Sequence, residues 1–173
     1  MHPIYRLSYT RVAWKNGIWV LKNSEAAEFV KLAETTYRDV NIALANQFAV
    51  HAEAMDVDIY EVIEASNSQN YSHIHQPGVA VGGHCIPVDP LYLAEAAREA
   101  GAPVRFIELA DEINLGMPTY FVGRASEMLG GLKDKKVLVI GVSYKPNVAD
   151  IRETPVEALI SGLKKSFRRL NWA

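Results

Sequence analysis

The sequence offers one strong nucleophile in an unusual setting. Cys85 follows Gly82, Gly83 and His84, and a carboxylate, Asp89, comes four positions later. Flanking glycines let a substrate approach the backbone closely, a neighbouring histidine can favour the thiolate, and a thiolate is the best nucleophile available in this chain. The alternative is an inert cysteine packed in a turn, and the residues alone leave both interpretations open.

A second candidate group is Lys31, which lies within an apolar stretch with Thr35 one helical turn further on. A buried ammonium needs a negative partner, so this amine either reaches solvent or meets an anion. A lysine and a hydroxyl on one helix face can together hold a developing oxyanion. On the pattern alone, a surface lysine whose stem covers the core is the favoured interpretation.

Other site chemistries have little support. Three histidines share one irregular region with Cys85, but their spacing matches no zinc signature, so we predict no metal site. Neither G-x-G-x-x-G nor G-x-x-x-x-G-K-[ST] occurs, so we expect no dinucleotide or phosphate site of the chain's own. A cysteine hydrolase is supported only by the adjacent His84.

These groups must be positioned mainly by helices. A long stretch from residue 26 to about 55 lacks glycine and proline, carries apolar residues on several faces, and follows the capping sequence Asn23-Ser24-Glu25. We expect other helices or a partner subunit to bury this helix on several sides. Further helices are predicted at 58–66, 91–100, 106–129 and 155–163. Pro118 either kinks the third of these or opens a new helix.

Two stretches differ from this helical pattern. Residues 67–90 are rich in polar residues, glycine and proline, which predicts a long, ordered functional loop. Residues 136–141 form an apolar run behind lysines, which is typical of a buried parallel strand, and 17–21 resemble a short strand. The run at 136–141 and the helix after it predict one βα unit of an α/β domain.

The bulk composition narrows the function classes. The chain has 173 residues, of which 49% are hydrophobic and 22% charged, with a formal net charge of -2. These values fit a globular protein and disfavour a nucleic-acid or membrane-surface partner. A lone cysteine cannot build disulfides, and no apolar stretch is long enough to span a bilayer. We therefore expect a cytoplasmic protein with no membrane partner.

Four stretches together resemble the UDP-glucose/GDP-mannose dehydrogenase family, in particular its N-acetylhexosamine branch. The most specific is the run GGHCIPVDP at 82–90. The others are the helical segment 31–46, the segment 112–118 with Glu112-Ile113-Asn114 and Met117-Pro118, and the segment 141–155 with Tyr144-Lys145-Pro146 and Asp150-Ile151-Arg152-Glu153. The likeness extends from about residue 17 to residue 163.

This resemblance implies a fold and a reaction. Members oxidise C6 of a nucleotide sugar from alcohol to carboxylate with two NAD⁺. Cys85 would form a thiohemiacetal and then a thioester, Lys31 with Thr35 would stabilise the oxyanion, and Asp89 would help to activate the hydrolytic water. The substrate would be a UDP-N-acetylhexosamine, such as UDP-N-acetylmannosamine or UDP-N-acetylglucosamine, or another UDP-hexose. The residues around it would be Gly82, Gly83, His84, Tyr144 and Lys145.

The resemblance also implies an incomplete enzyme. We expect a mainly α protein with three parts: residues 1–22 connecting from a missing NAD-binding domain, a helical substrate and dimerisation domain at 23–131, and a partial UDP-binding, Rossmann-like domain at 132–173. A homodimer would form through the helix 26–55. Without the NAD-binding domain we expect no turnover.

The sequence departs from the family pattern at three places, and two of them, Thr35 and Ala80, together with the lost domains favour a competing hypothesis. Thr35 replaces the family's asparagine, Ala80 replaces a loop glycine, and no arginine stands near Tyr71. Each change weakens the oxyanion support, the loop or the reach to a neighbouring subunit. The competing hypothesis is a non-catalytic homodimerisation module from a degenerate or truncated dehydrogenase.

Overall fold

The structure is a computed structural model that describes residues 19–168. The chain divides into two compact units, Met1–Lys31 and Leu32–Ala173. The described residues form five α-helices, so the predicted mainly α fold is confirmed for them. The helices are α2 (Ser24–Ala54), α3 (Ile59–Asn67), α4 (Asp89–Glu99), α5 (Arg105–Met128) and α6 (Val156–Arg168).

The helices begin where the sequence supplies capping groups. The Asn23 side-chain oxygen accepts a hydrogen bond from the Ala26 amide at 3.0 Å, which confirms the predicted start of α2. Asp58 caps α3 in the same way, by accepting from the Tyr60 amide at 2.8 Å. Both caps satisfy amides that have no partner within their own helix.

Helix α5 is continuous through Pro118, so this proline does not open a new helix. The helix stops at Gly130, whose φ of 64° is a left-handed conformation that glycine adopts at little cost. The Gly131 amide then donates to the Ser126 carbonyl at 2.7 Å, which closes the last turn.

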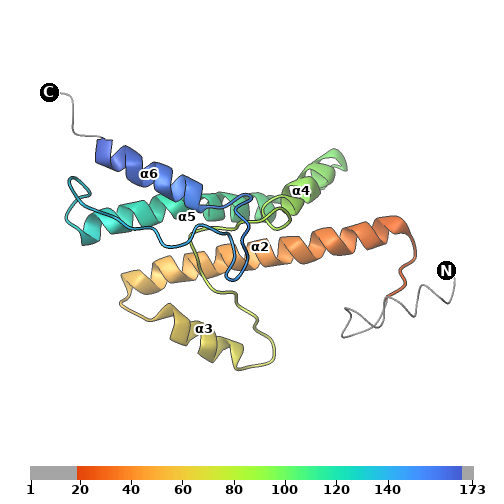
Figure 1. The fold of residues 1–173 in the computed structure, drawn as a ribbon. Helices are drawn as coiled ribbons and strands as arrows, with labels where there is room; N and C mark the ends of the chain where they lie inside the picture. The colour runs from red at the N-terminus through yellow and green to blue at the C-terminus, as the bar shows by residue number, and fades with distance from the viewer. Residues whose placement is uncertain (1–18, 169–173) are drawn as a thin grey trace. The chain divides into compact units, whose positions relative to one another are not determined.

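Helix α5 packs against both α4 and α6 (Figure 1). The contact with α6 is close at Gly162, where an added Cβ would lie 2.9 Å from Cγ2 of Val122. Glycine at this position therefore lets α6 approach α5 more closely than any other residue would.

The core of the second unit mixes apolar and polar groups. Apolar side chains such as Ile63, Ile107 and Met117 are buried, and so are Asp39, Asn46 and Asn114. Several large apolar residues of α2, in contrast, are exposed within this chain, among them Tyr37, Leu44 and Phe48. The described helices therefore do not bury α2 on several sides, and its burial by a partner subunit stays a prediction.

The prediction of a buried strand at 136–141 is wrong for the described chain. No described residue belongs to a β-strand, and the side chains of Leu138 and Ile140 are 84% and 91% exposed. A parallel strand is defined by hydrogen bonds to neighbouring strands and is buried by helices on both faces, and the described residues supply neither for this segment. The helix after it does form, as α6.

The predicted strand at 17–21 falls partly outside the described residues, and residues 19–21 have no regular structure. No helix among the described residues is both long enough and apolar enough to cross a membrane.

Candidate active site

The loop that leads from α3 towards Cys85 is fastened by side-chain amides. Asn67 makes a pair of hydrogen bonds with the backbone of Ile74, at 2.9 and 2.8 Å. Asn41, from α2, donates to the His73 carbonyl at 2.8 Å and accepts from the His75 amide at 2.9 Å. The loop is therefore ordered by polar contacts although it has no regular secondary structure.

A third amide holds the same loop at Gly78. The Gly78 amide donates to the side-chain oxygen of Asn46, at 2.8 Å. The nitrogen of Asn46 donates to Asn114 of α5 at 3.0 Å, and Asn114 in turn donates to Oδ1 of Asp39 at 2.8 Å. The loop is thus joined to a polar network inside the α2–α5 interface.

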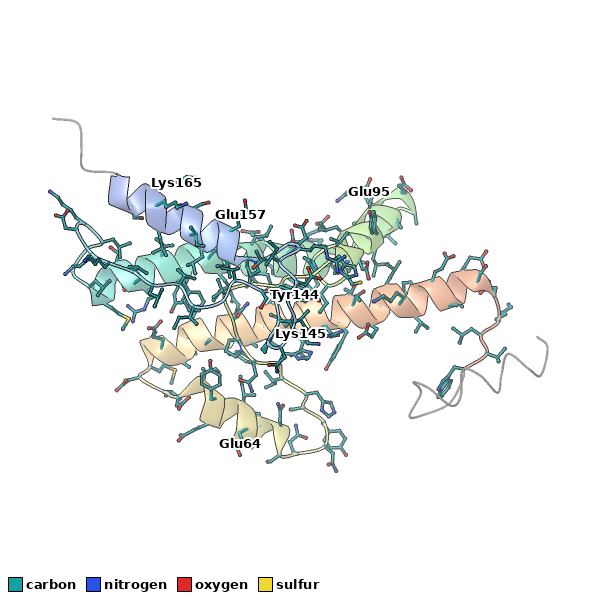
Figure 2. All side chains as sticks on the ribbon, viewed as in Figure 1. Glu64, Glu95, Tyr144, Lys145, Glu157 and Lys165 are labelled. Atoms are coloured by element: carbon teal, nitrogen blue, oxygen red, sulfur yellow. The ribbon has the colours of Figure 1, made fainter. Side chains whose placement is uncertain are left out.

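The irregular segment between α3 and α4, residues 68–88, is named here the cysteine loop. It also contacts the segment before α6. The Gly83 amide donates to the Arg152 carbonyl at 3.1 Å. Gly83 has a φ of 90°, and its α-carbon faces the ring of Tyr144; a Cβ on Gly82 would lie 2.5 Å from Cβ of Tyr144. Both glycines are therefore required by the close packing of Tyr144, which lies beside Lys145 on this segment (Figure 2).

Cys85 is half-buried and lies one turn before α4. Its carbonyl accepts hydrogen bonds from the amides of Val88 and Asp89, at 3.1 and 2.8 Å. These bonds turn the chain into the helix and bring Asp89, whose Oδ2 is shielded from solvent, into the first turn. The predicted catalytic Cys85 and Asp89 are thus linked through one short turn.

A charged pair lies next to the cysteine loop. Arg152 donates to both carboxylate oxygens of Asp150, at 2.5 to 3.0 Å. These hydrogen bonds lower the pKa of Asp150 to about 2; burial opposes this fall, and the charges of Arg152 and His84 add to it. The pKa of Arg152 is raised, mainly by Asp150 and to a smaller extent by the charges of Tyr144 and Cys85. Arg152 therefore lies within electrostatic reach of both site residues.

Two of the predicted catalytic residues lie on α2. Thr35 is fully buried and its hydroxyl donates to the Leu32 carbonyl at 3.2 Å, so its hydrogen is engaged within the helix. Lys31 is exposed and belongs to the first compact unit, so its pairing with Cys85 stays a prediction. His84 and Lys145 are exposed.

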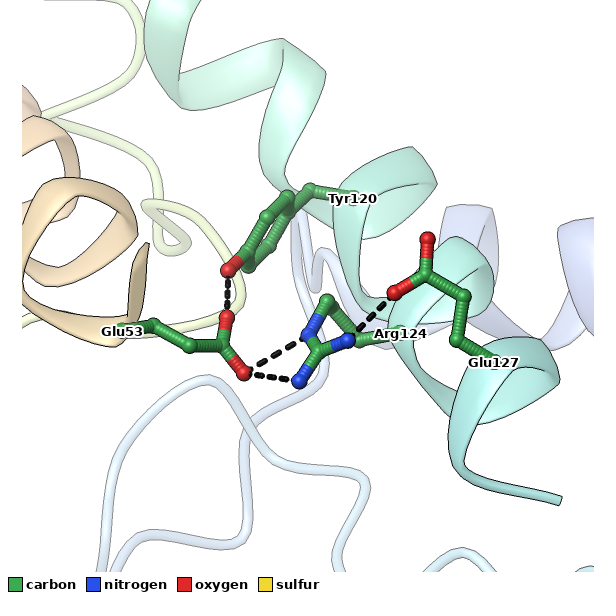
Figure 3. Close-up of polar contacts among 4 residues, drawn as sticks. All are labelled: Glu53, Tyr120, Arg124 and Glu127. Carbon is green, nitrogen blue, oxygen red and sulfur yellow. Dashed lines mark hydrogen bonds and ion pairs between the residues drawn. The ribbon is translucent and has the colours of Figure 1, made fainter. Parts of the chain in front are cut away.

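A pocket of about 570 Å³ lies elsewhere, among α2, α3 and α5. It adjoins Gly78 on the loop, and its lining includes Glu53 and Tyr120. Tyr120 and Arg124 both donate to Glu53, and Arg124 also pairs with Glu127 (Figure 3). The hydrogen bond from Arg124 is the main cause of the lowered pKa of Glu53. The Glu53 carboxylate is thus bound by side chains of α5. Neither Cys85 nor Asp89 lines this pocket.

No group of three or more histidine, cysteine, aspartate or glutamate side chains within residues 19–168 is arranged to hold a metal ion.

Comparison with known proteins assigns the scaffold that carries this site. Residues 25–115 match the profile described as UDP-glucose/GDP-mannose dehydrogenase family, central domain. This range covers α2 except its first residue, α3, the cysteine loop, α4 and the first part of α5. The chain belongs to the UDP-glucose/GDP-mannose dehydrogenase family. The resemblance inferred from the sequence motifs is therefore confirmed.

Relatives within the UDP-glucose/GDP-mannose dehydrogenase family agree on this region. The UDP-N-acetyl-D-mannosamine dehydrogenase of Methanocaldococcus jannaschii is 44% identical over 144 residues, which are 83% of this chain and 32% of that protein. The structure of a UDP-D-ManNAc dehydrogenase from Pyrococcus horikoshii superposes with a TM-score of 0.79 at 38% identity, over 88% of this chain and 37% of that one.

A UDP-glucose dehydrogenase structure from Pyrobaculum islandicum superposes with a TM-score of 0.76 at 32% identity, over 83% of this chain and 34% of that one. The chain thus spans about a third of the length of the curated relatives it matches.

Several residues hold the site in the structure but have no role that the sequence alone predicts: Asn41, Asn46, Asn114, Asp150 and Arg152. A usable signal existed for two residues of α2. Asp39 and Asn46 are seven positions apart, which places two polar side chains on one face of a helix that is otherwise apolar there. Nothing in the sequence indicates that Asn114 lies between them.

Proposed function

We propose that this chain is the substrate-handling part of an NAD-dependent UDP-sugar 6-dehydrogenase that acts on a UDP-N-acetylhexosamine or UDP-hexose. The observation that carries the proposal is the geometry around Cys85: the loop is closed onto Arg152 at Gly83, packed under Tyr144, and turned into α4 at Asp89. Family membership and the printed activities of the relatives support the same reaction class.

The proposed role of Cys85 is to capture an aldehyde at C6 of the sugar. The sulfur lone pair forms a C–S bond, the carbonyl π electrons move to oxygen, and the resulting oxyanion takes a proton to give a thiohemiacetal. The N-terminus of α4 favours negative charge near the thiolate. Lys31, with Thr35 beside it, would stabilise the oxyanion, and Asp89 would accept a proton from the water that later releases the carboxylate product.

NAD would supply the hydride acceptor in the complete enzyme. The described residues contain no strand–glycine turn–helix unit able to hold its pyrophosphate, so they do not fit this cofactor. We therefore expect the chain alone to show no NADH formation with any UDP-hexose, as measured by absorbance. Measurable NADH production would contradict this expectation.

The nucleophile proposal is tested by alkylation of Cys85 with iodoacetamide, followed by mass spectrometry. We expect labelling about fivefold faster than that of a free thiol, because an activated cysteine has a larger thiolate fraction at neutral pH. The Cys85→Ser variant, which should not label, is the control. A rate no faster than that of a free thiol would assign Cys85 a structural role.

We also propose the domain boundaries 1–22, 23–131 and 132–173, the last beginning a Rossmann-like domain, and a homodimer formed through residues 26–55. The exposed Tyr37, Leu44 and Phe48 of α2 support the dimer, because their spacing of seven and four residues places them on one helix face. Leu44→Glu should shift sedimentation towards the monomer. A parent chain that sediments only as a monomer would contradict the dimer.

The alternative function is a non-catalytic dimerisation module. It is favoured by one observation, the engagement of the Thr35 hydroxyl with its own helix, which leaves less support for an oxyanion. Normal dimerisation together with an unreactive Cys85 would favour this alternative.

A further inference from the structure

The hydrogen bonds between Gly78 and Asp39 form a chain with one possible direction. A backbone amide can only donate, so the Asn46 side chain must present its oxygen to Gly78 and its nitrogen to Asn114. Asn114 must then accept with its oxygen and donate with its nitrogen, which reaches Oδ1 of Asp39 at 2.8 Å and the Asp39 carbonyl at 3.2 Å. The Gly78 amide thus sets the orientation of both side-chain amides, those of Asn46 and Asn114.

This chain of hydrogen bonds is buried along its whole length. The exposed fractions of Asn46, Asn114 and Asp39 are 0%, 3% and 3%. Polar groups shielded from water to this extent lose their hydration, so each needs its partner in place. Displacement of Gly78 would leave the Asn46 oxygen without its donor, and this penalty resists movement of the loop.

Gly78 is one of three fixed points on the segment that carries Cys85. The second is the Gly83 amide, held by the Arg152 carbonyl, and the third is the Cys85 carbonyl, which is bound in the turn into α4. Only four residues, 79–82, separate the first two points, so a shift at Gly78 is passed to Gly83 and then to Cys85. Asn114 lies on α5, which also packs against α4, so the first and third points rest on the same helix.

We propose that Asp39, Asn114 and Asn46 are positioning residues that hold the cysteine loop through Gly78, a role that rests on the proposed function of Cys85. None of the three contacts the reacting atoms. They act through the loop backbone, and the Asp39 side chain is the fixed acceptor at the end of this series of hydrogen bonds.

The test measures two properties of the same variants: hydrogen exchange of the Gly78 amide and the pH profile of Cys85 alkylation. Asn46→Ala and Asn114→Ala should each speed exchange at Gly78 by about tenfold, the effect of losing one buried hydrogen bond. The alkylation rate should change by about threefold or more over the profile, because the thiol is displaced relative to its neighbours. The exposed neighbour variant Gln47→Ala should leave both unchanged.

A matched pair at Asp39 separates positioning from folding, and it decides the matter even where Asn114→Ala fails to fold. Asp39→Asn keeps an oxygen that accepts from Asn114, so Gly78 exchange and Cys85 alkylation should stay within about twofold of the parent. Asp39→Leu fills the same space but cannot accept, so it should reproduce the Asn46→Ala result. Exchange in α6 reports global unfolding, so the change at Gly78 is measured relative to the change in α6 in each variant.

Equal behaviour of Asp39→Asn and Asp39→Leu would overturn the proposal. So would faster exchange at Gly78 with an unchanged alkylation profile, because the chain would then hold the loop without positioning the thiol. Failure of the proposed function gives a different result: the parent Cys85 would alkylate at the rate of a free thiol, whatever the exchange at Gly78.

Discussion

Two irregular segments of this chain differ in how their backbone is bound and how their side chains are exposed. Residues 73–89 have no strand, yet their backbone is bound by Asn67, Asn41 and Asn46 and closes onto Arg152. Residues 133–142 are also irregular, but their apolar side chains at Leu138 and Ile140 face solvent. The comparison teaches that side-chain amides can fix a loop within one chain, whereas a strand needs a neighbouring strand.

The largest effect is expected at Asp39, the buried residue that ends the hydrogen bonds leading from Gly78. Burial raises the pKa of Asp39 to about 6; the hydrogen bond from Asn114 opposes this rise and the charge of Asp111 adds to it. The folded protein therefore holds this proton more tightly than the unfolded chain, so the contribution of Asp39 to stability is fully present below about pH 4 and is lost as the pH rises through 6. The loss amounts to at most roughly 3 kcal/mol.

Asp39→Asn should remove most of this pH dependence and stabilise the protein at pH 8, as measured by urea unfolding at pH 4.5 and pH 8. Asp111 also has a raised pKa and adds a smaller slope that the variant keeps. Equal pH dependence in the parent and the variant would show that Asp39 is not the titrating group.

The next effect tests the contact that closes the cysteine loop. Gly82→Ala places a methyl group 2.5 Å from Cβ of Tyr144 and 3.0 Å from the Glu153 carbonyl oxygen, so the backbone must move. We expect a loss of about 1–3 kcal/mol in urea unfolding and faster exchange of the Gly83 amide. Gly78→Ala is the matched control, because nothing lies within 4 Å of its added Cβ. Similar losses in the two variants would contradict the contact.

A smaller effect is expected at the charged pair beside the loop. Asp150 has a pKa lowered to about 2, mainly by its hydrogen bonds with Arg152, so its contribution is present above about pH 4 and is lost as the pH falls towards 2. Asp150→Asn should lower the thermal midpoint slightly at pH 7 and not at pH 2. A drop of the same size at both values would point to a role other than the ion pair.

The smallest effect is expected in the exposed segment, residues 133–142. Ile140→Ser changes a side chain that is 91% exposed, so stability should change by less than about 0.5 kcal/mol in urea unfolding. A loss several times larger would show that this segment is packed in solution, and would remove the contrast with the cysteine loop.

The sequence predicted the parts of this fold that depend on local signals. Asn23 caps α2 as predicted, and α3 and α5 end within two residues of the predicted bounds, because capping residues and apolar periodicity act locally. The cap at Asp58 was not predicted, since this residue was placed inside the helix 58–66. The motif around Cys85 is specific enough to identify the family from the residues alone. The strand at 136–141 was predicted from its apolar run, but a strand also needs a partner that the described residues do not contain.

The contacts that hold the site could not be predicted in the same way. The hydrogen bonds from Gly78 to Asp39 join residues that are far apart in sequence: Gly78 and Asn46 by 32 positions, and Asn46 and Asn114 by 68. Each asparagine by itself resembles an ordinary polar residue of a helix. The packing of Tyr144 on Gly82 likewise joins distant segments. Such pairings follow from tertiary packing and not from local pattern.

The exposed segment at 137–142 has a consequence for the behaviour of the protein at high concentration. Its backbone joins no sheet within the described residues and can template edge-to-edge association, but Lys133, Lys135 and Lys136 lie just before it and act as gatekeepers. Two copies aligned in parallel along this edge would bring these ammonium groups together. Their repulsion weakens as ionic strength rises, so clustering through this edge should be promoted by salt and suppressed in dilute buffer.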